Sequence, residues 1–547
     1  MESLPPEILS QILSHLDRND TIECVRVCRS WCKLIPPYAA PLWSHVHLSQ
    51  DAYHILDGVP IFSPFIHTIT LVNYDAHLEK ALKMLSSASN HLALQKLKLQ
   101  GTRMRPNPDF IELFRPMHVD DLEVEDTTRD VSERMDFLDL MATAQPRSFY
   151  YSDTPNIIPD IYPWFTFHLK DVNSPLCERL VSLTLKIYGF QFDLMTLLQH
   201  CPNLKRLQTG FDTQASSDDI MASCPRLQYL DCNSIFDARK ELEWVETPPP
   251  PPPPPHDEQQ GLLLRYLRYR KVDAQTLDFV LKYQSTLELL HLDCKHTAYR
   301  PKWQPFATQF QSATLRMLSC RMLGDGEFLS TLIPSCPNLE RVQLSGVRPR
   351  AAIWDALASL PKLELLELGL CSDRTQPGDD EQQAIAELQQ MFSKLSLKYL
   401  ALRNDSIFYN MLKPSVLLEA VRHQRDLEEL EVNCETLVEP MDVDQFFTYL
   451  SHMPHLKHLD LAYLPFPNDL AFAPLCNTCI GIESINLTHC RNVTDELLRA
   501  ILDTLAPQRL RKLHVIGNSK VAFPDIFTRY MMNKYNGRLD FLIIKNM

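Results

Sequence analysis

Cysteine and histidine side chains are the residues of this sequence whose spacing comes closest to a chemical site. Cys476-Asn477-Thr478-Cys479 is a CxxC pair, and His489 and Cys490 follow it along the chain. A structural zinc site needs a second ligand pair at matching distance, and a redox pair needs a thioredoxin-like strand, turn and helix around it. The sequence offers neither context. The pattern therefore indicates thiols in the core of a repeat, and we expect no metal site.

Catalytic motifs are also missing from the sequence. Gly324-Asp325-Gly326 lacks the third glycine and the Lys-Ser/Thr pair of a phosphate-binding loop. HExxH, GxSxG and the kinase signatures do not occur. We therefore expect a protein that is not an enzyme and uses no cofactor. A hydrolase or transferase hidden on a repeat scaffold is the alternative from another class.

Composition limits the partners and the compartment. The 547 residues carry a net charge of −14, and no basic stripe opposes it, so nucleic acid is not an expected partner. No uninterrupted apolar run reaches the roughly 20 residues that span a bilayer, so we expect no membrane segment. Fifteen cysteines without a visible signal peptide are typical of reduced thiols, which places the protein in the cytoplasm or the nucleus.

One pattern recurs along most of the chain: an apolar residue, two variable ones, an apolar one, one variable and a last apolar one. Clear copies begin at Leu339, Leu363, Leu397, Leu427 and Leu456. Further copies begin at Leu94, Leu180, Leu204, Leu227, Leu264, Leu287, Leu315, Ile482, Leu510 and Leu539, and weaker ones at Ile66, Val119 and Pro146. Self-similarity at this period is the signature of leucine-rich repeats.

Each copy predicts one short strand, because alternate residues of a strand face opposite sides. The fourth and sixth positions would enter the core, and the third and fifth would face outward. Helical patterns lie between the copies, and several end in Cys-Pro, as at Cys201-Pro202 and Cys336-Pro337. We expect an α/β repeat over residues 61–547: a horseshoe solenoid with a concave parallel sheet and convex helices.

The first 48 residues have a different pattern, that of a short helical module, with a linker expected over residues 49–60. Apolar side chains from Ile8 to Leu16 form one stripe of a helix. Asp20 and Glu23 suggest a capping box for a second helix, which Pro36-Pro37 would end. So small a module buries too little surface to be stable alone, so part of its apolar face must meet another surface. Packing against the rest of this chain is the plainer interpretation, and docking of a partner is the other.

The module resembles an F-box, through Leu4-Pro5-x-x-Ile8, Ile12, Leu16, Val27-Cys28-Arg29-x-Trp31 and Leu42-Trp43. The resemblance implies docking on a Skp-type adaptor, which joins cullin and RING subunits. By position, it implies a docking face made of Leu4, Pro5, Ile8, Leu9, Ile12, Leu13, Val27, Cys28 and Trp31, with Leu42 and Trp43 beside it. Cys490-Arg491-Asn492-Val493-Thr494-Asp495 resembles the cysteine-containing repeats that often follow an F-box.

A run of eight prolines, residues 248–255, interrupts the repeats within a proline-rich insertion at 247–258. It should form a polyproline II rod. A ligand for an SH3, WW or profilin-like domain is one interpretation, and a spacer loop is the other.

The outward positions predict where a target protein would bind, because aromatic and arginine side chains dominate interface energetics. The candidates in the central repeats are Arg206, Tyr229, Tyr266, Arg268, Leu289, Met317, Arg341, Leu365 and Tyr399, with Glu429, Glu431 and Asp460 as an acidic end. The alternative is that some tyrosines only pack against neighbouring strands. Together the resemblances imply the substrate receptor of an SCF-type ubiquitin ligase, which captures targets for ubiquitination and proteasomal degradation. An adaptor-bound scaffold or inhibitor without a ligase role is the alternative.

Overall fold

The computed structural model describes the chain in segments that together form two compact units, residues 1–264 and 265–547. The described residues are 5–13, 15–74, 77–88, 94–102, 108–126, 137–153, 165–167, 177–186, 190–192, 194–209, 216–232, 264–269, 272, 274–294, 300–324, 326–371, 379–404, 412–434, 442–464, 472–490, 493–505, 509–517 and 540–544. The proline-rich insertion at 247–258 lies outside them, so its expected rod stays a prediction.

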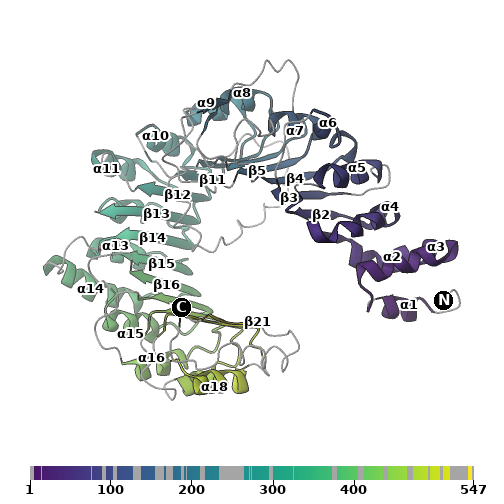
Figure 1. The fold of residues 1–547 in the computed structure, drawn as a ribbon. Coiled ribbons are helices and arrows are strands. Elements are labelled where there is room, and N and C mark those ends of the chain that lie inside the picture. The colour runs from purple at the N-terminus through teal and green to yellow at the C-terminus, as the bar shows by residue number, and fades with distance from the viewer. Residues whose placement is uncertain are drawn as a thin grey trace. The chain divides into compact units, whose positions relative to one another are not determined.

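The first unit contains three N-terminal helices followed by a ladder of parallel strands (Figure 1). The strands, in ladder order, are β1 (His45–Ser49), β2 (Thr68–Val72), β3 (Lys96–Thr102), β4 (Asp121–Asp126), β5 (Ser148–Asp153), β7 (Ser182–Lys186), β9 (Arg206–Thr209) and β10 (Tyr229–Cys232). The helices are α1 (Pro6–Leu13), α2 (Arg18–Val27), α3 (Arg29–Trp43), α4 (Val59–Phe62), α5 (Leu78–Ala88), α6 (Pro108–Glu112), α7 (Phe137–Ala144), α8 (Leu194–Gln199) and α9 (Ser217–Ser223). A separate parallel pair joins β6 (Phe165–Phe167) to β8 (Phe190–Phe192).

The second unit is also an open parallel ladder. Its strands, in order, are β11 (Tyr266–Tyr269), β12 (Leu289–Cys294), β13 (Met317–Gly324), β14 (Arg341–Val347), β15 (Leu365–Leu370), β16 (Tyr399–Asn404), β17 (Glu429–Asn433), β18 (His458–Ala462), β19 (Ser484–Thr488), β20 (Lys512–Ile516) and β21 (Asp540–Ile544). Its helices are α10 (Ala274–Tyr283), α11 (Arg300–Gln309), α12 (Leu329–Leu332), α13 (Ala351–Ala358), α14 (Asp379–Phe392), α15 (Pro414–Arg422), α16 (Val443–Leu450), α17 (Ala473–Thr478) and α18 (Asp495–Leu505). Figure 1 shows α11, α13, α14, α15 and α16 along one side of strands β12 to β16, and α12 contacts both α11 and α13.

The strands are where the repeated pattern predicts them, with their fourth and sixth positions in the core. In β18, for example, Leu459 and Leu461 are buried, whereas His458 and Asp460 on the opposite face are partly exposed. The copy assigned to Leu539 was wrong by one residue, because β21 pairs Phe541, not Leu542, with Leu513 of β20. A one-residue slip exchanges the two faces of a strand.

The N-terminal helices differ from the expectation at two points. The capping box of α2 is formed by Asp17 and Asp20, three residues before the predicted pair. The second helix ends at Val27, and α3 continues through Pro36, Pro37 and Pro41 to Trp43. Each internal proline costs a helix about 3 kcal/mol or more. The buried stripe of α3 offsets that cost, since Ile35, Pro36, Ala39 and Trp43 all lie in the core.

The strand ladder begins earlier than predicted. Trp43, Val46 and Leu48 form one more copy of the repeated pattern, and β1 pairs in register with β2, Val46 opposite Ile69. The segment expected as a linker at 49–60 is mainly helical, with a 3₁₀ helix over Gln50–Gly58. The end of α3 is therefore already part of the first repeat, and the helical module and the solenoid share residues 43–48.

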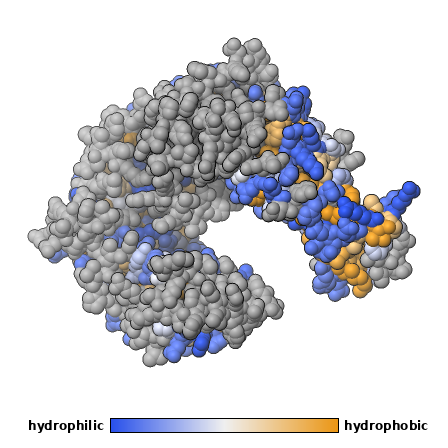
Figure 2. All heavy atoms as spheres, viewed as in Figure 1, coloured by the Kyte–Doolittle hydropathy of each residue, from blue (hydrophilic) through white to orange (hydrophobic). Residues whose placement is uncertain are grey.

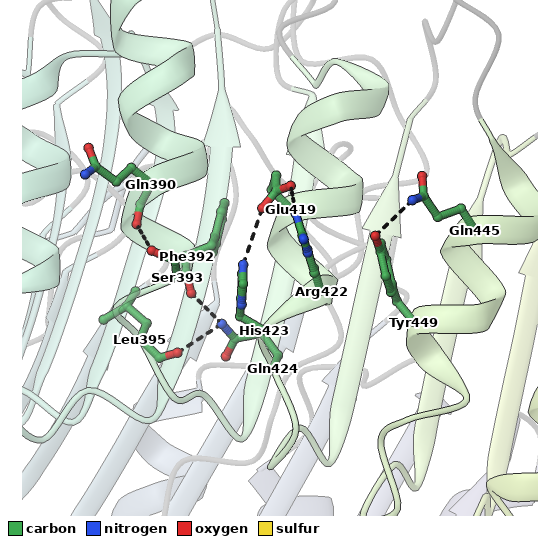
Figure 3. Close-up of polar contacts among 10 residues, drawn as sticks. All are labelled: Gln390, Phe392, Ser393, Leu395, Glu419, Arg422, His423, Gln424, Gln445 and Tyr449. Carbon is green, nitrogen blue, oxygen red and sulfur yellow. Dashed lines mark hydrogen bonds and ion pairs between the residues drawn. The ribbon is translucent and has the colours of Figure 1, made fainter.

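A polar side chain at the end of the helices links some repeats to the one before. Cys479, three residues before Ile482, donates from Sγ to the carbonyls of Leu450 and Met453 at 3.3 and 3.4 Å. Gln424, three residues before Leu427, takes this place in its own repeat: its Nε2 donates to the carbonyls of Phe392 and Leu395 at 2.9 and 3.0 Å (Figure 3). These buried bonds give carbonyls at or just beyond the end of a helix a side-chain donor from the following repeat.

Candidate interaction surfaces

Apolar side chains lie open on the N-terminal helices. Ile8 and Ile12, one turn apart on α1, are 43% and 38% exposed, and Val27 at the end of α2 is 65% exposed. Figure 2 shows apolar residues, in orange, at the surface of this part of the chain. Among the described residues, the other exposed large apolar side chain is Ile480, in the second unit. The exposed apolar groups are therefore concentrated on the module, as its small size predicted.

The other residues of the predicted docking face divide into open and covered ones. Pro5 and Cys28 are exposed, and Trp31 and Leu42 are partly exposed. Leu4 lies outside the described residues. Leu9, Leu13 and Trp43 do not face outward: they are 2%, 3% and 0% exposed. Their assignment to the docking face is corrected, because packing within this chain already covers them.

Trp43 connects the module to the first repeat. Its ring stacks on Phe62 with centroids 4.2 Å apart, and its Nε1 donates to Thr21 Oγ1 at 3.1 Å. A Cβ at Gly58 would lie 2.5 Å from the Trp43 ring, so only glycine fits there. Arg18 of α2 also donates from Nη2 to the His45 carbonyl at 2.7 Å. The module and the first repeat thus share one core.

Two of the nine predicted target-binding residues lie in the first unit. Arg206 and Tyr229 are register partners on β9 and β10, and the Arg206 guanidinium carbon lies 4.2 Å from the Tyr229 ring centroid. Such a cation–π contact orders both side chains. The tyrosine therefore packs on its neighbour, as the alternative interpretation had it, while both residues stay partly exposed.

The strands of the second unit bring six of the other seven into one row. Ladder pairing aligns Tyr266, Leu289, Met317, Arg341, Leu365 and Tyr399 across β11 to β16. All six side chains are partly exposed. Arg268 lies two residues along β11 from Tyr266, on the same face. We call the face that carries this row, turned away from the helices, the ladder face.

A charge network occupies the middle of the ladder face. Arg403 on β16 pairs with Glu367 on β15 at 2.9 Å and with Glu431 on β17 at 2.7 Å, and the Tyr399 hydroxyl donates to Glu431 at 3.4 Å. Burial raises the pKa of the Glu367 carboxyl, and Arg403 partly opposes that shift. Sequence reasoning missed Arg403, although it lies two residues beyond the fifth position and hence on the same face.

Asp460 on β18 has different surroundings. Asn486 Nδ2 of β19 donates to its Oδ2 at 2.9 Å. Burial raises the pKa of Asp460 to about 6, and the nearby Glu431 carboxylate acts in the same direction. Of the predicted acidic end, Glu431 is thus already paired with Arg403, whereas Asp460 accepts its hydrogen bond, among the described residues, from the Asn486 amide.

The cysteines singled out in the sequence lie in the repeat core. Cys476, Cys479 and Cys490 are all buried, and burial raises the pKa of Cys476 and Cys490 to about 12. Cys490 Sγ donates to the Leu461 carbonyl at 3.2 Å. A thiol held protonated in this way is a poor metal ligand and a poor nucleophile.

Within the described ranges, no helix combines the length and apolar character needed to cross a bilayer.

The fold and these surfaces define a class: a repeat protein whose strand-and-helix units follow the leucine-rich pattern, with a helical module at its N-terminus. Residues 1–49 match the family model described as F-box-like. The protein therefore combines an F-box-like domain with a leucine-rich-repeat solenoid. No curated protein matches the sequence. A solved leucine-rich-repeat protein of Leptospira interrogans is similar at 13% identity and a TM-score of 0.31, over 92% of this chain and 97% of that one.

Proposed function

We propose that this protein is the substrate-receptor subunit of an SCF-type cullin-RING ubiquitin ligase, acting in the cytoplasm or the nucleus. The observation that supports this proposal most directly is the cluster of exposed apolar side chains on the F-box-like domain. Ile8, Ile12 and Val27 are exposed, although the neighbouring side chains of Leu9, Leu13 and Val25 are buried in the module. Covering such side chains is worth about 1.5–3 kcal/mol for each one fully buried. A Skp-type adaptor is the partner that the F-box-like domain generally binds.

The mechanism needs no acid, base or nucleophile from this chain. The F-box-like domain holds the adaptor, and through it the cullin and RING subunits, while the repeats hold the target. Tethering raises the effective concentration of a target lysine near the charged conjugating enzyme to the millimolar range when the span fits. The shared core around Trp43 supports this role, because a rigid joint fixes the module relative to the first repeat.

Co-purification of the tagged full-length protein from cells of its own source tests the proposal. We expect a Skp-type adaptor and a cullin in the eluate, and we expect both to be lost in the Ile12→Asp and Val27→Asp variants. Ile480→Asp is the matched control, since Ile480 is 55% exposed but lies in the second unit. Equal loss with Ile480→Asp, or adaptor binding unaffected by all three changes, would contradict docking at this surface.

The same experiment distinguishes the alternative role. An eluate with the adaptor but without a cullin would favour an adaptor-bound scaffold or inhibitor over a ligase receptor. Cullin recovered together with the adaptor, and in vitro ubiquitination of a co-purified protein, is the result that the receptor role requires.

A further inference from the structure

The charges of the ladder face differ between two neighbouring groups of four strands in the second unit, β11 to β14 and β15 to β18. Strands β11 to β14 carry three arginines, Arg268, Arg321 and Arg341, against one aspartate, Asp293. Strands β15 to β18 carry four carboxylates against one arginine: Glu367, Glu429, Glu431 and Asp460 against Arg403. All of these residues occupy alternate positions of their strands, so they share one face. The face is therefore positive over β11 to β14 and negative over β15 to β18.

Most of the partly buried charged side chains in the middle of the ladder face already form ion pairs with one another. Arg403 holds Glu367 and Glu431. Among the residues that the structure describes, Arg341 makes no ion pair, and Asp460 accepts its one hydrogen bond from the neutral amide of Asn486. Both side chains are partly buried, and both lie on the ladder face. Opposite charges act on both from a distance, Glu367 on Arg341 and Arg403 and Lys512 on Asp460, but neither side chain forms a direct ion pair with a described residue. A directly bound partner of opposite charge reduces the cost of holding a charge partly out of bulk water.

Apolar side chains lie along the same face. Leu289 and Met317 precede Arg341 in the row, and Leu365 and Tyr399 follow it. Four strand spacings of about 4.8 Å, with an offset of two residues along the strand, put Arg341 and Asp460 about 20 Å apart. An extended peptide rises about 3.3 Å per residue, so it covers that distance in about six residues.

We propose that the ladder face of the second unit binds an extended segment of the target protein, with an acidic residue on Arg341, a basic residue about six positions away on Asp460, and apolar residues between them. This inference rests on the proposed function only in taking the bound segment to be that of a target. A docked lysine or arginine would give Asp460 a direct ion pair, which none of the described residues forms with it. The apolar residues of the segment would cover Leu365 and Tyr399.

A random twelve-residue peptide library displayed on phage, selected on the immobilised full-length protein, tests the inference. We expect the selected peptides to share an acidic and a basic residue about six positions apart, with apolar residues between. The best of them, made synthetically, should bind Arg341→Gln and Asp460→Asn about tenfold more weakly, the usual effect of losing one charged hydrogen bond. The control variants are Arg316→Gln and Asp444→Asn, which lie off the face and should bind as the wild type does.

Double-mutant cycles make the assignment residue by residue. A peptide whose acidic residue is replaced by glutamine should bind the wild type and Arg341→Gln equally well, and a peptide without its basic residue should not distinguish Asp460→Asn from the wild type. Failure to select any peptide, selected peptides without the paired charges, or an absence of coupling in both cycles would overturn the inference. The selection contains no adaptor, so peptides can be selected even if the proposed ligase role is wrong. Conversely, adaptor binding can be confirmed even if no peptide is selected.

Discussion

Trp43 and Phe62 lie face to face, with ring planes 4° apart and centroids separated by 4.2 Å. The tryptophan ends the last helix of the F-box-like domain, and it is also the first apolar position of the first repeat. Its partner belongs to α4, beyond the segment that the sequence suggested was a linker. This stacked pair makes the two parts of the protein one folded body at their junction.

Replacing each of the two tryptophans of the F-box-like domain by alanine should therefore have a different effect. Trp43→Ala removes a fully buried ring and should lower the free energy of unfolding by about 3–5 kcal/mol. Trp31→Ala removes a partly exposed ring and should leave stability nearly unchanged while abolishing adaptor binding. Urea unfolding and an adaptor pull-down measure the two effects. If both changes lowered the free energy of unfolding equally, the difference in exposure between Trp31 and Trp43 would not determine their contributions to stability.

Gln424→Ala should be one of the more damaging single changes in the second unit. It leaves the carbonyls of Phe392 and Leu395 and the amide of Leu397 without their buried partner. An unsatisfied buried group costs about 1–3 kcal/mol, so we expect a loss of about 2–4 kcal/mol in unfolding free energy. Gln445→Ala is the matched control (Figure 3): Gln445 is exposed and its side-chain amide donates to the Tyr449 hydroxyl, so the loss of unfolding free energy should stay below about 0.5 kcal/mol. Similar effects of the two changes would contradict the bridging role of Gln424.

Asp460→Asn should stabilise the protein at neutral pH. The folded-state pKa of Asp460, about 6, is above the ordinary value of 3.8, so the folded chain binds a proton more tightly than the unfolded chain. This group therefore makes the protein more stable as pH falls from about 7 towards 4, and less stable as it rises. The asparagine variant should gain up to about 3 kcal/mol at pH 7 and lose that part of the pH dependence. Unfolding measured at pH 4.5 and pH 7 tests this, and a variant less stable at pH 7 would contradict it.

Replacing Tyr266 and Arg268 together by alanine should weaken target capture and spare adaptor binding. Both residues lie on β11 in the second unit, far along the chain from the F-box-like domain. Mass spectrometry of the co-purified proteins gives the measurement, with circular dichroism as the folding control. Loss of the adaptor together with the target would point to misfolding and would remove the support for a binding role of these two residues.

Local sequence features predicted the repeats well, because a strand whose alternate residues are apolar shows its buried face in its pattern. The positions of β14 to β18 follow directly from Leu339, Leu363, Leu397, Leu427 and Leu456. The same reasoning missed the repeat that begins at Trp43, because this residue both ends α3 and occupies the first apolar position of the first repeat. It also failed at α3, where buried side chains offset three prolines.

What the sequence determined by itself was thus the architecture: an apolar helical module, a periodic strand, and the two faces that each strand must have. Tertiary structure alone decided which of two like neighbours stays open to solvent. Ile8 and Leu9 are adjacent on α1 and equally apolar, yet the first is 43% exposed and the second 2%. The exposure of a side chain depends on which segments from elsewhere in the chain cover it. The same holds for charge, since only the ladder register shows that Arg403 forms an ion pair with Glu431, whereas among the described residues Asp460 accepts its hydrogen bond from the Asn486 amide.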